Sequence, residues 1–168
     1  MPVALSQSLS QQLLQRIPQV AQMSLRFVPF QLKAKAIKEM LAIILKEQME
    51  DDELGFLNGK WVAIVVSDFN FAFEVSFNDE WLVREPQGAD VTFSADSKAL
   101  IKVAANVEDP DTLFFQRQLF IEGDTELGLE VKNLFLSIEM DLLPSKMSKV
   151  VKQLSVIVEG LENRAKIA

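Results

Sequence analysis

Residues 109–134 constrain the fold more than any other part of this sequence, because they encode three elements with little chain between them. Asp109 followed by Pro110 predicts the start of a short helix, since aspartate caps helix N-termini and proline fits the first helical position. Residues 117–122 then alternate between apolar and polar side chains, which predicts a strand. Together with the helix that follows, this segment has two apolar faces that require cover.

A second helix is predicted directly after this strand. Gly123 permits a tight turn, and Asp124 or Thr125 is suited to cap the helix that follows. The apolar residues of that helix recur at helical spacing and form a single stripe, which is made of Leu127, Val131, Leu134, Phe135 and Ile138. The segment is thus predicted to be a helix, a strand and a helix in close succession.

Four further strands are predicted upstream. Residues 61–67 are apolar on both faces, which is typical of a central strand. Residues 69–77 place Phe69, Phe71, Phe73, Val75 and Phe77 on one face. Residues 81–84 and 91–95 complete a five-stranded, mostly antiparallel sheet, and residues 96–107 form a helix. The fold class is α+β.

The spacing of apolar residues divides the chain into three parts. Residues 29–49 read as one long amphipathic helix that opens a domain spanning residues 29–144. Residues 1–28 form an N-terminal helical extension, and residues 145–168 form a C-terminal amphipathic helix. The long helix is expected either to pack on the domain or to line a lipid cavity or meet a membrane surface, because basic amphipathic helices bind anionic lipid.

The composition disfavours several functional classes. The 168 residues contain no cysteine and no histidine, so disulfides, thiolate catalysis and the commonest metal ligands are excluded. The net charge of −7 argues against nucleic-acid binding. This charge is unevenly spread, with +4 over residues 1–49, −14 over residues 50–144 and +3 over residues 145–168. The basic residues of the two ends either lie on solvated helix faces, attract the acidic middle of the chain or touch an anionic surface.

No motif indicates an enzyme. Asp109 and Asp111 stand where capping and first-turn carboxylates belong, and Arg117 is expected to form an ion pair with Asp111. The sequence GDTELG lacks the lysine of a phosphate-binding loop, and the acidic pairs lack the spacing of a calcium loop. We therefore expect a non-catalytic protein without a cofactor or metal.

The sequence contains no apolar run of the ~20 residues that a membrane-spanning helix needs, and its N-terminus is not patterned as a signal peptide. We expect a cytoplasmic protein, which could also bind peripherally to the inner membrane.

The segments ADVTFSAD, residues 89–96, and DPDTLFFQRQLFIEGDTELGLEVKNL, residues 109–134, resemble the sterol carrier protein type 2 domain family. The resemblance covers roughly residues 28–145. Within that family, the sequence most resembles bacterial accessory factors of ubiquinone biosynthesis. It implies a sheet and helices that enclose an apolar lipid tunnel. It further implies a role in oxygen-independent ubiquinone synthesis, presenting polyprenylated intermediates to hydroxylases of the UbiU and UbiV type.

An apolar enclosure is also what the residues themselves offer, since each exposed CH2 group of a polyprenyl tail costs ~0.8 kcal/mol in water. The expected cargo is an isoprenoid quinone precursor or a phospholipid, and Lys33, Lys35 and Lys38 are placed to attract an anionic head group or membrane. The expected lipid-binding residues are Leu25, Phe27, Phe30, Ile37, Leu41, Ile44, Phe71, Phe73, Leu127, Val131, Leu134, Phe135 and Ile138.

Two alternatives stay open. One is a scaffold protein with a fully packed core and no ligand, in which the same apolar residues are ordinary core. The other is a peripheral membrane protein whose terminal helices bind acidic phospholipid and which has no role specific to quinones.

Overall fold

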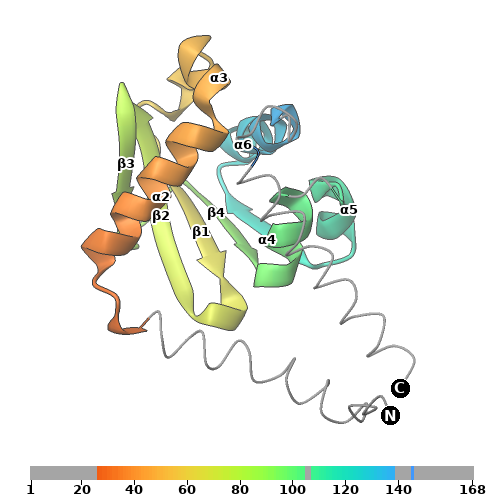
Figure 1. The fold of residues 1–168 in the computed structure, drawn as a ribbon. Helices are drawn as coiled ribbons and strands as arrows, with labels where there is room; N and C mark the ends of the chain where they lie inside the picture. The colour runs from red at the N-terminus through yellow and green to blue at the C-terminus, as the bar shows by residue number, and fades with distance from the viewer. Residues whose placement is uncertain (1–25, 105–106, 139–144, 146–168) are drawn as a thin grey trace, which may run out of the picture.

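The computed structural model describes residues 26–104, 107–138 and 145, so the predicted N- and C-terminal helices lie outside the described residues. Helices, two short 3-10 helices and five strands follow one another along the chain (Figure 1). Their bounds are α2 Phe30–Ile44, α3 Lys46–Glu50, η1 Gly55–Leu57, β1 Val62–Val66, η2 Ser67–Phe69, β2 Phe71–Asn78, β3 Glu80–Arg84, β4 Val91–Ala95, α4 Ser97–Ala104, α5 Pro110–Phe115, β5 Leu119–Gly123 and α6 Thr125–Ser137.

The five strands form one sheet in the order β3-β2-β1-β4-β5. In this sheet β1 pairs with β4 in parallel, and the other three pairings are antiparallel. The predicted α+β class with a five-stranded, mostly antiparallel sheet is therefore confirmed. The strand predicted to be central, β1, is the middle strand, as expected for a strand that is apolar on both faces.

The register assigns each side chain to one of two faces, because directly paired residues share a face and successive residues alternate. The face that we call the apolar face is made of Trp81, Val83, Phe71, Phe73, Val75, Phe77, Val62, Ile64, Val66, Val91, Phe93, Ala95, Leu119 and Ile121. The face that we call the opposite face includes Ala63, Val65, Ala72, Glu74, Ser76, Leu82, Arg84, Thr92, Ser94, Phe120 and Glu122.

Helices cover the apolar face. Helix α2 packs over β3 and α6 packs over β4 and β5, so that β1 runs between the two helices (Figure 1). Residues from α2, α4, α5 and α6 join the strands in one hydrophobic cluster. Leu113 of α5 and Val91 of β4 are among its most deeply buried members. The fold therefore rests on one apolar layer between sheet and helices.

Residues 109–134 form the predicted helix, strand and helix, but the strand begins at Leu119 and not at residue 117, where Arg117 has a left-handed φ of 58°. The carboxylate of Asp109 accepts hydrogen bonds from the backbone N–H groups of Asp111 and Thr112 at the start of α5. The carboxylate of Asp124 caps α6 in the same way. Gly123 has φ +110°, and a Cβ there would collide with the backbone oxygen of Asp90. Glycine is therefore required at this turn.

Two further predicted elements differ from the structure. The long helix predicted over residues 29–49 is interrupted at Leu45, whose φ and ψ of −107° and 27° divide it into α2 and α3. The strand predicted to begin at Phe69 begins at Phe71, because Phe69 ends η2 and Asn70 has a left-handed φ of 46°. The carboxylate of Asp68 accepts a hydrogen bond from the Ser97 N–H at 2.8 Å, which fixes η2 against α4.

Candidate functional site

Four side chains of the apolar face form a half-buried patch at one end of the sheet. Ile64 pairs with Phe73 and Val66 pairs with Phe71, so the four are contiguous, and we call them the β1–β2 patch. The rings of Phe71 and Phe73 lie 5.4 Å apart. All four are half-buried although β1 is the middle strand, whereas Val62, on the same face of β1, is buried. The described residues therefore cover the sheet incompletely at this end.

Half-buried apolar residues of the helices border the same layer. Leu41 and Ile44 of α2 and Leu134 and Phe135 of α6 pack against the core cluster without being fully buried. The Phe135 ring lies 6.2 Å from the ring of Phe93 in an edge-to-face arrangement. The layer between α2 and α6 is therefore lined by half-buried apolar side chains from the sheet and from both helices.

A basic group lies at the edge of the β1–β2 patch. The Nζ atom of Lys33, on α2, is 4.9 Å from the centroid of the Phe71 ring, within the range of a cation–π contact. Lys33 was one of three lysines predicted to stand near the apolar space. The structure places its ammonium group directly against that space.

The thirteen predicted lipid-binding residues fall into distinct environments. Leu25 lies outside the described residues, and Phe27 is 83% exposed. Three others are buried core residues, namely Ile37, Leu127 and Val131. The rest are half-buried, namely Phe30, Leu41, Ile44, Phe71, Phe73, Leu134, Phe135 and Ile138. The prediction did not include Ile64 and Val66, although the apolar character of both faces of β1 was a signal for them.

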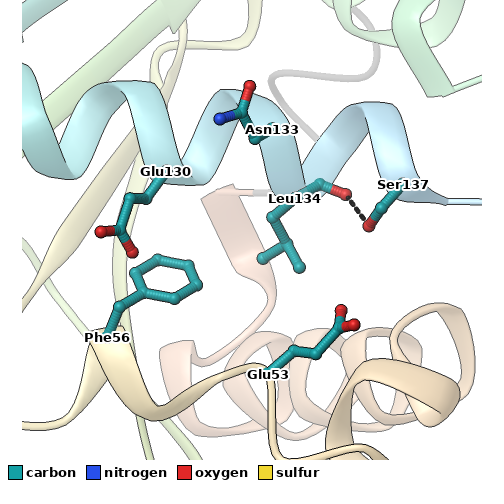
Figure 2. A pocket seen from close by; sticks show the side chains of 6 residues that line it. All are labelled: Glu53, Phe56, Glu130, Asn133, Leu134 and Ser137. Carbon is teal, nitrogen blue, oxygen red and sulfur yellow. Dashed lines mark hydrogen bonds between the residues drawn. The ribbon is translucent and has the colours of Figure 1, made fainter.

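A cavity of about 360 Å³ opens between η1 and α6. Figure 2 shows Glu130, Asn133, Leu134 and Ser137 of α6 on one side and Glu53 and Phe56 on the other. The lining residue Ser137 also accepts, at its Oγ atom, a hydrogen bond of 3.3 Å from the buried Gln48 side chain, which links α3 to α6. Four of its six lining residues are polar or acidic, and the cavity shares only Leu134 with the predicted set, so it is not the lipid enclosure that the sequence predicted.

The opposite face holds a buried carboxylate. Glu74 is 1% exposed and accepts hydrogen bonds from Arg84 Nε at 2.7 Å and from the Gln87 and Gly88 N–H groups at 2.9 Å each. Burial alone would raise the pKa of Glu74, but the hydrogen bonds and the charge of Arg84 outweigh it and lower the pKa below its usual value. Arg84 in turn lies 3.6 Å from the ring centroid of Trp61. This network fixes the loop between β3 and β4 to the sheet.

The described residues contain no cluster of three or more metal-ligating side chains, and none of their helices is both long and apolar enough to cross a bilayer. The ion pair predicted between Arg117 and Asp111 is wrong: Asp111 pairs instead with Lys132 Nζ, at 2.8 Å. This pair joins α5 to α6, which is a structural role.

Comparison with known proteins identifies the family to which this fold and sequence correspond. The profile of the SCP-2 sterol transfer family matches residues 37–136. The ubiquinone biosynthesis accessory factor UbiT of Escherichia coli K12 is 41% identical over 144 residues, covering 85% of this chain and 83% of that protein. UbiT of E. coli O157:H7 matches equally.

The fold has a counterpart among solved structures. A structure described as UbiJ-SCP2 ubiquinone synthesis protein superposes with a TM-score of 0.51 at 21% identity, and covers 64% of this chain and 96% of that one. The chain therefore belongs to the SCP-2 sterol transfer family, as a relative of the accessory factor UbiT.

Proposed function

We propose that this protein is a lipid-binding accessory factor of ubiquinone biosynthesis. The observation behind this proposal is the 41% identity to UbiT over most of both chains, together with the match to a lipid-transfer family over the whole sheet and α6. The half-buried apolar layer between α2 and α6 is consistent with such a role, because binding a lipid tail requires apolar surface and few polar groups.

The proposed cargo is a polyprenylated intermediate, with its tail on the β1–β2 patch between α2 and α6. Each CH2 group that leaves water for this layer contributes ~0.8 kcal/mol to binding. The ammonium group of Lys33, which lies against Phe71, is placed to contact a polar head group at the edge of the patch. On this proposal the half-buried members of the predicted lipid-binding set contact cargo, while Ile37, Leu127 and Val131 support the walls.

The proposed role is presentation and not catalysis. The protein would hold its cargo for hydroxylases of the UbiU and UbiV type during oxygen-independent ubiquinone synthesis, in the cytoplasm or at the inner membrane. The lipid-binding unit would be residues 29–144, and residues 1–28 and 145–168 would be accessory segments that contact membrane or partners.

Filling the β1–β2 patch is the test. Ile64→Trp adds bulk on the apolar face, and Val65→Trp introduces the same side chain at the neighbouring half-buried position on the opposite face. Each purified variant is mixed with a polyprenylated phenol, and bound lipid is measured after gel filtration, with circular dichroism melting as the control for folding. We expect Ile64→Trp to lose most uptake and Val65→Trp to retain it, because only the first occupies the cargo space.

The opposite outcome has a clear meaning. If a folded Ile64→Trp variant takes up as much polyprenylated phenol as the wild type, the tail does not lie on the β1–β2 patch. If the wild type takes up none, the apolar layer is simply a packed core, and the protein is a scaffold.

A further inference from the structure

Strand β5 is an edge of the sheet, and none of the described residues pairs with its outer side. In the strand order β3-β2-β1-β4-β5, β5 pairs only with β4. An edge strand leaves a row of backbone N–H and C=O groups without a partner strand, and such a row can pair with a strand of another chain. Within the described part of the chain, the outer side of β5 is therefore open to an added strand.

The two edges of the sheet differ in their protection against such pairing. The other edge strand, β3, begins with Glu80 and ends with Arg84, and Pro86 follows it. Charged residues and proline discourage pairing at an edge. In contrast, β5 contains neither lysine nor proline, and its Phe120 side chain is 51% exposed on the opposite face. The less protected edge thus carries a large exposed aromatic group.

The hydrogen-bond pattern shows which backbone groups of β5 point outward. The Asp124 N–H donates to the Asp90 carbonyl at 2.8 Å, so these two residues form a hydrogen-bonded pair next to the β4–β5 ladder. Hydrogen-bonded and non-hydrogen-bonded pairs alternate in an antiparallel ladder. The even-numbered residues of β5 therefore bond to β4, whereas Leu119 and Ile121 direct their N–H and C=O groups outward.

The charges at the two ends of β5 have opposite signs. Arg117 lies just before the strand, Glu122 lies near its other end and Glu126 lies just beyond that end, and all three side chains are exposed. Antiparallel alignment of two copies of β5 would place the basic start of each strand beside the acidic end of the other. Opposite charges across such a pair of strands stabilise it. The strand is therefore complementary to a second copy of itself.

We propose that two copies of this chain associate by antiparallel pairing of their β5 strands, with Phe120 at the two-fold axis. In this register Leu119 of each copy pairs with Ile121 of the other, so the outward backbone groups of both residues gain partners. The two Phe120 residues form a non-hydrogen-bonded pair, in which the Cα atoms lie about 4.5 Å apart and the rings can touch. The two five-stranded sheets become one continuous sheet.

This interface is separate from the proposed cargo site. Phe120 lies on the opposite face of the sheet, whereas the cargo site lies on the apolar face between α2 and α6. Because the two-fold axis is perpendicular to the joined sheet, the two apolar faces lie on the same side of it. Substitutions of Phe120 should therefore change self-association without changing uptake of a polyprenylated phenol. The two proposals can fail independently.

Single cysteines test the register directly, because the chain has no cysteine of its own. Phe120→Cys would place two thiols across the axis on Cα atoms about 4.5 Å apart, which a disulfide can bridge. Glu122→Cys is the matched control: it is exposed on the same face of the same strand, but its two copies would lie more than about 13 Å apart. After mild oxidation of the purified full-length variants, a non-reducing gel should show mainly covalent dimer for Phe120→Cys and mainly monomer for Glu122→Cys.

A second pair of variants tests the strength of self-association. Phe120→Lys would place like charges opposite each other, and an edge lysine opposes pairing. Leu129→Lys is its control, because Leu129 is 53% exposed on α6 and gains the same charge. In analytical ultracentrifugation over a concentration series, we expect Phe120→Lys to weaken dimerisation by about tenfold or more and Leu129→Lys to leave it near wild type. Circular dichroism melting checks that both variants fold.

Three results would overturn the proposal. A wild type that stays monomeric at every concentration would show that no second copy pairs with β5. A folded Phe120→Cys variant that gives no more covalent dimer than Glu122→Cys would contradict the register. A dimer that Phe120→Lys and Leu129→Lys weaken equally would place the interface elsewhere on the molecule.

Discussion

The two faces of the sheet are built from different interactions. On the opposite face, polar side chains have fixed partners: Glu74 holds Arg84 and two loop N–H groups, and the Ser76 hydroxyl donates to the Leu57 carbonyl at 3.0 Å. The apolar face is held by packing alone, and its β1–β2 patch is half-buried. Hydrogen bonds are directional and are costly to leave unmade, whereas dispersion contacts are non-directional and can be made equally well with the methylene groups of a ligand. The apolar side is thus the one that can admit a ligand without breaking a bond.

The largest expected effect concerns packing on the apolar side. Leu113 of α5 is 0% exposed, and Leu113→Ala should lower the free energy of unfolding by about 2–5 kcal/mol, because it removes buried contacts and leaves a cavity. Phe115→Ala, on the same helix at a side chain that is 81% exposed, should change it by less than about 0.5 kcal/mol. Urea denaturation measures both. Equal effects would show that the apolar layer is not where the stability lies.

The next effect concerns the opposite face. Glu74→Gln removes the charge that Arg84 and the loop N–H groups bind, and should cost about 1–3 kcal/mol in the free energy of unfolding. Glu122→Gln is the matched control, because Glu122 is exposed on the same face.

The same variant should change the pH dependence of stability. The pKa of Glu74 is lowered in the folded protein from an ordinary value of 4.5, so its stabilising effect is complete above pH 4.5 and is lost as the pH falls toward the lowered pKa. The wild type should therefore lose stability below pH 4.5 more steeply than Glu74→Gln does. Parallel curves for the two proteins would mean that the Glu74 network does not stabilise the charged form.

The smallest expected effect on stability is at the β1–β2 patch. Phe71→Leu keeps an apolar side chain of similar reach at a half-buried position, so the free energy of unfolding should change by less than about 1.5 kcal/mol. Uptake of a polyprenylated phenol should nevertheless change, because this ring lines the proposed cargo space and contacts Lys33. A large loss of stability with unchanged uptake would make Phe71 a core residue and reverse the assignment of the patch.

Local signals were sufficient for much of the fold. The caps at Asp109 and Asp124 and the apolar stripe of α6 depend on neighbours within a few residues, and all were predicted. The turn at Gly123 was predicted as well, but the close approach of the Asp90 backbone to it was not. The break at Leu45 and the late start of β2 were missed. The second of these depends on Asp68 bonding Ser97, a contact between residues 29 positions apart.

The candidate site was less accessible to sequence reasoning for the same reason. Alternation along residues 69–77 assigned Phe71 and Phe73 to one face but gave no measure of their cover. The half-burial of Ile64 depends on where α2 and α6 lie, which only the packed structure shows. The Glu74 network likewise requires a loop from residues 87–88 to return to β2.

The most direct measurement is native mass spectrometry of the purified full-length protein, followed by organic extraction and identification of the bound lipid. If the apolar face admits cargo, the protein should carry one isoprenoid quinone precursor or phospholipid per chain, or take up a polyprenylated phenol when it is supplied, and Ile64→Trp should lose it. A bare protein that takes up no lipid under these conditions would contradict the account and leave the apolar layer as a closed core.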